Sequence, residues 1–200
     1  MLPVQHDHVD LLAGLHHVAL GGDDGKGVGG GHGGEDAGAL RSGEGGVVAS
    51  IPLGDDAAGE EGARVVCSVR SQQRRDSVGK LLPGCDLYVC DVESDEQIHT
   101  LAEDLRAEHP TIHGLVHAVA FANYESFSGQ FHEVSRRDFV QCVSVSCYSL
   151  IAIANAFKEL LDRRASVVTI SISTTRMAVE SYGYMAPAKA ALDSSLTFLA

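Results

Sequence analysis

Tyr182 and Lys189 are the residues of this chain whose types and spacing most directly suggest chemistry. Tyr182 stands seven positions before Lys189, and on a helix that separation is about two turns, which would place both side chains on one face. A phenol with a pKa of about 10 keeps its proton at neutral pH, and a neighbouring ammonium helps it to donate that proton, or a strong hydrogen bond, to an oxyanion. The same spacing is also typical of an ordinary amphipathic helix, so the surrounding elements must decide between the two interpretations.

Short apolar runs alternate with helix-like segments from about residue 63 onward. The runs, rich in β-branched and apolar residues as buried strands are, span 64–69, 86–90, 112–120 and 165–171. Helices are expected at 94–110, 135–163 and 181–200, and the first two open on the capping residues Ser94 and Ser135. This alternation predicts an α/β fold with a Rossmann-like, doubly wound parallel sheet. In such sheets ligands bind beyond the carboxyl ends of the strands.

The first sixty or so residues differ in composition from the rest. Seventeen of the twenty-two glycines fall between Gly14 and Gly62, and ordering so much glycine costs backbone entropy that little apolar burial offsets. Residues 1–61 are therefore expected to form a low-complexity, disordered segment before a domain at 62–200. Five of the ten histidines lie in the first forty residues, but no Cys or carboxylate completes a ligand set at a recognisable spacing, so no metal site is expected.

Charge and composition restrict the class of protein. The net charge of −12 argues against a nucleic-acid or anionic-membrane surface. No apolar run approaches the roughly 20 residues that span a bilayer, and the first residues lack a basic region followed by an apolar one. The five cysteines form no CxxC pair and indicate buried thiols in a reducing compartment. A cytoplasmic protein is expected.

From about residue 62 to the end, the chain resembles the enoyl-acyl-carrier-protein reductases. These enzymes are a branch of the short-chain dehydrogenase/reductase superfamily that spaces its catalytic tyrosine and lysine by seven positions rather than four. The residues that carry the resemblance are 115–122 (LVHAVAFA), 182–189 with the following Ala-Ala-Leu, the triplet Cys90-Asp91-Val92, and Tyr148-Ser149-Leu150. Residues 62–200 would then form a partial Rossmann-like reductase domain.

The resemblance implies a role for individual residues. Tyr182 would donate a proton or hydrogen bond to the enolate that forms when hydride reaches the β-carbon of a trans-2-enoyl thioester, and Lys189 would hold the nicotinamide ribose of NADH or NADPH. The other residues implied in cofactor binding are Asp91, Val92, Ala118, Val119 and Ala120, and those implied in substrate binding are Phe121, Ala122 and Tyr184. The substrate would be bound to acyl carrier protein in fatty-acid biosynthesis, and the enzyme would be a homodimer or homotetramer.

Arg70 bears on the choice of cofactor. It directly follows an expected strand, at a position that commonly meets the adenosine ribose, where an acid favours a free 2′-hydroxyl and an arginine accommodates a 2′-phosphate. With Arg74 and Arg75 close by in the sequence, Arg70 favours NADPH, and a solvated basic helix start with NADH as cofactor stays open.

Three features depart from the family. Ile172 stands where the family has a second active-site tyrosine, ten positions before the first. The family's first strand and glycine loop have no clear counterpart; the nearest match is 46–54, whose Ser50 and Ile51 echo the cofactor-binding loop. The chain also ends within the Tyr-Lys helix. Two alternatives therefore stay open: an inactive fragment or non-catalytic nucleotide-binding or oligomerising α/β module, and another short-chain carbonyl oxidoreductase.

Overall fold

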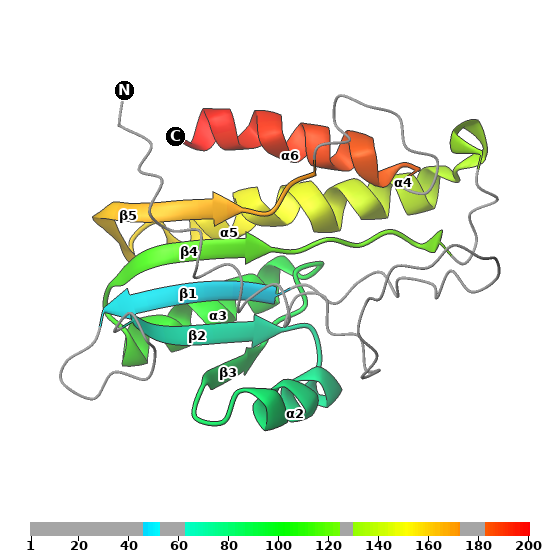
Figure 1. Ribbon diagram of the computed structural model, residues 1–200. Coiled ribbons are helices and arrows are strands. Elements are labelled where there is room, and N and C mark those ends of the chain that lie inside the picture. The colour runs from blue at the N-terminus through cyan, green and yellow to red at the C-terminus, as the bar shows by residue number, and fades with distance from the viewer. Residues whose placement is uncertain (1–45, 53–62, 125–129, 173–182) are drawn as a thin grey trace, which may run out of the picture.

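The computed structural model describes residues 46–52, 63–124, 130–172 and 183–200. Five strands form one sheet in the order β3-β2-β1-β4-β5 (Figure 1). They are β1 (Gly46–Pro52), β2 (Ala63–Val69), β3 (Asp86–Val89), β4 (Ile112–Ala118) and β5 (Leu161–Thr169). β2 pairs with β3, and β4 with β5, in parallel. The expected Rossmann-like α/β architecture is confirmed in these two parallel halves.

The central strand, β1, runs antiparallel to both of its neighbours. It occupies the place for which the sequence offers no clear first strand, and it comes from the stretch whose composition predicts disorder. Val47, Val48 and Ile51 are β-branched residues that favour a strand, which explains why this piece pairs where the surrounding glycines would not. The remainder of 1–61 lies outside the described residues.

Helices connect the strands and cover the sheet. They are α2 (Gln72–Leu81), α3 (Asp95–Glu108), α4 (Arg136–Val143), α5 (Ser149–Phe157) and α6 (Met185–Leu199). A short 3-10 helix, η2 (Phe131–Glu133), precedes α4, and a π-helical turn, η3 (Ser144–Tyr148), joins α4 to α5. The capping prediction is confirmed, because the hydroxyls of Ser94 and Ser135 accept hydrogen bonds from the third residue of their helices.

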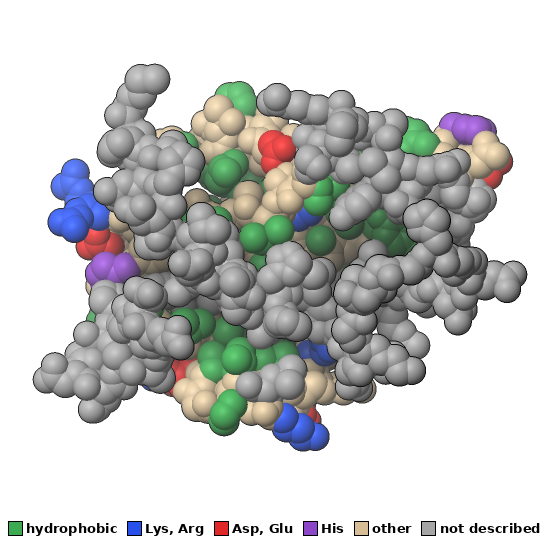
Figure 2. Space-filling view, in the orientation of Figure 1, with side chains coloured by type: hydrophobic (Ala, Val, Ile, Leu, Met, Phe, Trp, Pro, Cys, Tyr) green, Lys and Arg blue, Asp and Glu red, His purple; other side chains and the backbone are tan. Residues whose placement is uncertain are grey.

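The main core lies between the sheet and one helical layer. Ile98 and Leu105 of α3, Leu115 of β4, and Ile153 and Phe157 of α5 are all buried in one apolar cluster, and each such side chain contributes roughly 1.5–3 kcal/mol. Figure 1 shows α6 running alongside the α4–α5 helix, which it contacts. On the face turned to the viewer in Figure 2, hydrophobic side chains lie over the middle of the molecule and charged ones mainly toward its rim.

Two expected helix boundaries are wrong. The helix expected to reach residue 163 ends at Phe157, because residues from Leu161 onward pair with β4 as strand β5. The last helix begins at Met185 rather than at 181. Gly183 has a φ of 45°, a left-handed conformation that a right-handed helix cannot continue through. Lys189 therefore lies on the helix, and Tyr182 lies outside the described residues.

The α4–α5 helix is the one described helix that could span a membrane by length and composition, with 22 residues from Arg136 to Phe157 and a mean hydropathy of 1.5. One apolar face of it packs in the protein interior, because Leu150, Ile153 and Phe157 are fully buried and the helix contacts α3 and α6. Among the described residues it is a core helix of the α/β layer.

Candidate active site

A pocket opens at the carboxyl ends of β2, β3 and β4. Its lining consists of Arg70, Cys90, Asp91, Val92, Glu93, Val119, Ala120, Phe121 and Val145. The backbone N–H of Cys90 donates to the carbonyl of Val69 at 2.8 Å, which keeps the ends of β2 and β3 side by side. Six of the residues implicated from the sequence, Arg70, Asp91, Val92, Val119, Ala120 and Phe121, are thus brought together.

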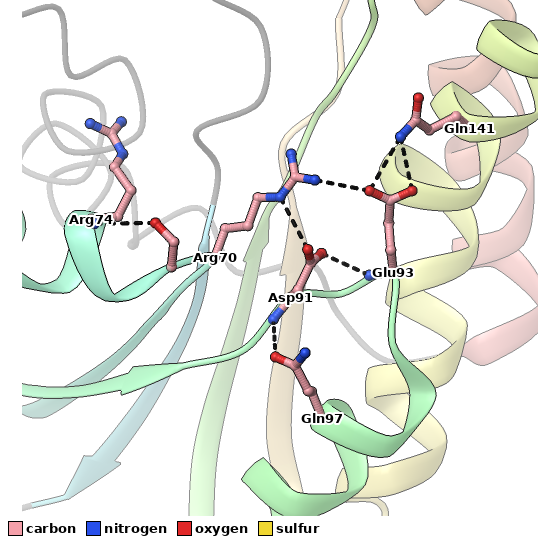
Figure 3. Close-up of polar contacts among 7 residues, drawn as sticks. Arg70, Arg74, Asp91, Glu93, Gln97 and Gln141 are labelled. Atoms are coloured by element: carbon pink, nitrogen blue, oxygen red, sulfur yellow. Dashed lines mark hydrogen bonds and ion pairs between the residues drawn. The ribbon is translucent and has the colours of Figure 1, made fainter.

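Arg70 is the cation of this pocket, and two carboxylates hold it (Figure 3). Its Nε donates to Asp91 Oδ2 at 3.2 Å and its Nη2 to Glu93 Oε2 at 3.1 Å. The guanidinium carbon also lies 5.6 Å from the centre of the Phe121 ring, within the range of a cation–π contact. Arg70 therefore bridges the strand ends on which adenine-binding and substrate-facing residues were predicted.

Glu93 and Gln141 belong to the same network and were missed in the sequence. The Gln141 side-chain amide, reaching across from α4, donates to the two carboxylate oxygens of Glu93 at 3.0 and 3.3 Å. Glu93 is two positions after Asp91, and its backbone N–H donates to Asp91 Oδ1 at 3.1 Å, so the turn after β3 could have suggested it. Nothing in the sequence points to Gln141, which is 48 positions away from Glu93.

Lys189 is buried behind the strand ends, with 3% of its surface exposed. Its Nζ donates to the carbonyls of Val119 at 3.1 Å and Ile170 at 2.7 Å, so it ties the end of β4 to the end of β5. An ammonium has three N–H donors, and these two carbonyls take two. Burial lowers the pKa of Lys189 to about 8, so at neutral pH the side chain is still mainly charged.

His117 is fully buried beside Lys189 and connects β4 to β5 and to the first residue of α5. Its Nε2 lies 2.8 Å from Ser149 Oγ and its Nδ1 lies 3.1 Å from Thr169 Oγ1. Burial, and then the charge of Lys189, lower its pKa to about 3, so the ring is neutral. The Ser149 hydroxyl in turn donates to the carbonyl of Val145 at 2.6 Å, and the Thr169 hydroxyl donates to the carbonyl of His117 at 3.2 Å, so both hydroxyls that meet the ring are also tied to the backbone.

Ser146, within the π-helical turn, fixes the backbone of Phe121. The N–H of Phe121 donates to Ser146 Oγ at 2.9 Å, and that hydroxyl donates to the Phe121 carbonyl at 3.2 Å. A π-helical turn shifts the register of the helix by one residue and is often found at functional sites. Here it directs Ser146 toward the strand end and Ser149 toward His117. Sequence reasoning assigned no role to Ser146.

Similarity to known proteins agrees with this geometry. A sequence model of the family described as "Enoyl-(Acyl carrier protein) reductase" matches residues 56–200. The chain belongs to the enoyl-(acyl carrier protein) reductase family. The resemblance inferred from the residues at 115–122 and 182–189 is thereby confirmed.

Curated and solved reductases show how much of the family pattern is present. The NADH-dependent FabI of Enterococcus faecalis is 36% identical over 142 residues, which cover 70% of this chain and 57% of that enzyme. The NADPH-dependent FabI of Staphylococcus aureus is 35% identical over 144 residues, covering 70% and 56%. The crystal structure of the NADH enzyme from Aquifex aeolicus aligns with a TM-score of 0.63 at 31% identity, over 66% of this chain and 60% of the other. The chain therefore spans somewhat more than half the length of the reductases it matches.

The remaining predicted residues of this reductase-family chain lie outside the pocket. Ala122 and Tyr184 are buried in an apolar cluster with Cys142, Met185 and Ala188, against which Ile172 packs. The Tyr184 ring lies 5.8 Å from that of Tyr124, and burial raises its pKa to about 12. Tyr184 is therefore part of an apolar cluster against which Ala120 packs, and it does not line the pocket itself. Ala118 is the last residue of β4 and pairs with Gly46 of β1.

The structure does not bring Ser50 and Ile51 to the pocket edge. Because β1 runs antiparallel, Ser50 pairs with Val65 and Gly114, which are well before the carboxyl ends of β2 and β4. The amino end of β1 is the end that lies near the pocket. Tyr182 lies outside the described residues, so its role stays a prediction.

Proposed function

We propose that this chain carries the cofactor site and the proton-donating residues of an enoyl-acyl-carrier-protein reductase of fatty-acid biosynthesis. The reaction would move hydride from NADH or NADPH to the β-carbon of a trans-2-enoyl thioester bound to acyl carrier protein. The observation that carries the proposal is the meeting of Arg70, Asp91, Val92 and Phe121 in one pocket. Lys189 lies directly behind the strand end that forms part of this pocket.

The pocket residues fit a dinucleotide of this kind. Asp91 and Arg70 present charged groups suited to ribose hydroxyls, while Val92, Val119 and Ala120 offer small apolar surfaces on which a flat base can lie. The remaining N–H of Lys189 is available for a ribose hydroxyl, as in the role predicted from the resemblance. When bound, the reduced nicotinamide supplies the hydride.

The chain's own residues then handle the proton and the charge. Tyr182 donates its phenolic proton to the enolate oxygen that develops on the thioester, and the ammonium of Lys189 lowers the energetic cost of the negative charge that this leaves. Phe121, with its backbone fixed by Ser146, forms the substrate side of the pocket. The two hydrogen bonds with Ser146 keep the Phe121 backbone in place when substrate binds.

Association into a homodimer or homotetramer is part of the proposal, as is a cytoplasmic location. Val140, Tyr148 and Ile151 of the α4–α5 helix are large apolar side chains that are 58, 46 and 37% exposed. Apolar side chains gathered on one helix face favour burial against another subunit. Analytical ultracentrifugation should show a dimer or larger species for the chain, and the double variant Tyr148→Lys, Ile151→Glu should shift it to monomer.

A non-catalytic nucleotide-binding module is the second candidate, and the direction of β1 favours it. The carboxyl end of β1, at Pro52, lies at the opposite edge of the sheet from Asp91, because Pro52 pairs with Ala63 at the start of β2. The carboxyl end of β1 is thus away from the pocket, whereas in Rossmann-like folds the loop that anchors the dinucleotide phosphates follows the carboxyl end of the first strand.

Turnover separates the two candidates. The purified chain should consume NADH or NADPH, followed by absorbance, when given a crotonyl thioester of acyl carrier protein, and Tyr182→Phe should abolish this. Tyr88→Phe is the matched control, because its hydroxyl bonds Glu108 on α3 outside the pocket. Saturable dinucleotide binding without turnover would favour the module, and the absence of both would contradict either function.

A further inference from the structure

The Enterococcus faecalis relative is an NADH enzyme and the Staphylococcus aureus relative is an NADPH enzyme. Family membership therefore does not decide the cofactor, and the choice must be inferred from the pocket residues of this chain. An inference about that choice rests on the proposed function. The residues that would determine the choice between NADH and NADPH lie where the sheet would meet the adenosine half of the dinucleotide. Arg70 follows β2, Asp91 follows β3, and Glu93 lies in the turn that leads into α3 (Figure 3).

The charge of Arg70 is already offset. Its guanidinium bonds Asp91 at 3.2 Å and Glu93 at 3.1 Å, so one positive charge faces two negative ones. A 2′-phosphate carries close to two negative charges at pH 7. To reach Arg70 it would have to displace both carboxylates or lie next to them, and like charges at hydrogen-bond distances repel strongly even near the surface.

The turn that carries the two carboxylates is also held by three further sets of hydrogen bonds. Gln141 of α4 donates to both oxygens of Glu93. The Asp91 N–H donates to the side chain of Gln97 at 2.9 Å, and the Glu93 N–H donates to Asp91. Moving Glu93 away from an incoming phosphate would break its bonds with both Arg70 and Gln141. The cluster is therefore fixed before any ligand arrives.

A free 2′-hydroxyl suits the same cluster. A hydroxyl can donate to a carboxylate oxygen and accept from the guanidinium, so NADH would keep every existing ion pair. Arg74, the other nearby basic residue drawn in Figure 3, directs its side chain away from Asp91 and Glu93. The cation expected from the sequence to favour NADPH is thus paired with groups that oppose a phosphate.

We propose that Glu93, positioned by Gln141 and Arg70, makes this chain select NADH over NADPH. Titration of the full chain with each reduced dinucleotide, followed by nicotinamide fluorescence, tests this. NADH should bind about tenfold or more tightly than NADPH, since about 1.4 kcal/mol of repulsion corresponds to that ratio. Glu93→Gln removes the charge but keeps the shape, and it should bring the ratio of the two dissociation constants close to one by strengthening NADPH binding.

Glu103→Gln is the matched control. Glu103 is a carboxylate on α3 that is 62% exposed and pairs with His99, outside the pocket lining, so removing its charge should leave the ratio as in the wild-type chain. Equal or tighter binding of NADPH by the wild-type chain, or an unchanged ratio in Glu93→Gln, would overturn the inference while leaving the proposed function standing. Binding of neither dinucleotide would contradict the proposed function itself, and the inference with it.

Discussion

The ends of β2 and β3 hold their polar groups in solvent, whereas the ends of β4 and β5 hold theirs in the core. Arg70, Asp91 and Glu93 are each about a third exposed or more, while His117 and Lys189 are buried to 3% exposure or less. Exposed ion pairs contribute little to stability. Buried polar groups must stay satisfied, so they fix geometry.

The two clusters at this edge of the sheet are therefore suited to different roles. The exposed cluster is suited to choosing a ligand, because its charges line the pocket and contribute little to the stability of the fold. The buried cluster is suited to keeping Lys189 and the backbone of Phe121 in one position. If the contrast holds, substitutions in the buried cluster should affect activity and stability strongly, and substitutions in the exposed cluster should affect ligand preference.

The largest effect is expected for Lys189→Met. Losing the ammonium removes electrostatic stabilisation of the reacting oxygen and leaves the carbonyls of Val119 and Ile170 without this donor, so kcat for NADH oxidation should fall by about 10²-fold or more. Lys158→Met, at an exposed lysine after α5, is the control and should retain the wild-type rate. A Lys189→Met variant with wild-type kcat would remove Lys189 from the mechanism.

Alkaline stability should reveal the same buried charge. The pKa of Lys189 is about 8 in the folded chain against an ordinary 10.5, so between those values the unfolded chain binds more protons than the folded one. Stability from this group therefore rises as the pH goes from 8 to 10.5, by roughly 3 kcal/mol. Urea unfolding at several pH values in this window should show that the difference in unfolding free energy between wild type and Lys189→Met rises with pH. A difference that does not change with pH would indicate that the lysine is not buried.

His117→Gln should weaken the junction of β4, β5 and α5. Glutamine cannot reproduce the positions of both ring nitrogens, so the buried hydroxyls of Ser149 and Thr169 lose a partner, at a cost of about 2 kcal/mol. Because the folded pKa of His117 is about 3 against an ordinary 6.5, its contribution to stability is lost as the pH falls through that interval. The variant should accordingly show a shallower acid dependence in urea unfolding; an unchanged slope would mean that His117 is solvated.

The smallest effect on stability is expected for Arg70→Gln. Its ion pairs are exposed, so the free energy of unfolding should change by less than about 1 kcal/mol. A loss as large as that expected for His117→Gln would show that the exposed and buried clusters do not differ, and would contradict the comparison. Thermal unfolding of both variants side by side makes this check.

Most residues of the pocket could be predicted because they directly follow strands that the sequence identifies. The β-branched runs before Arg70, Asp91 and Val119 identify strands, and parallel pairing then brings their ends together. The direction of β1 was not predictable, because an alternating or apolar run such as 46–52 has the same pattern in either direction. The bond from Gln141 to Glu93 was not predictable either, because it joins residues 48 positions apart whose side chains carry no motif.

The π-helical turn escaped prediction for another reason. Residues 144–148 keep a helix-compatible composition, and a shift from α to π hydrogen bonding leaves no mark in residue types. Its consequence, the placement of Ser146 on Phe121 and of Ser149 on His117, appears only in three dimensions. The start of the last helix was also not predictable, because the left-handed conformation of Gly183 precedes a helix that begins only at Met185.

Hydrogen–deuterium exchange on the full chain, with and without saturating NADH, tests the central claim most directly. If the exposed and buried clusters flank one dinucleotide site, NADH should slow exchange together in peptides covering 69–71, 90–93 and 118–122, and leave the far end of α3 unchanged. Protection confined to other segments, or none at these three strand ends despite saturable binding, would contradict the account.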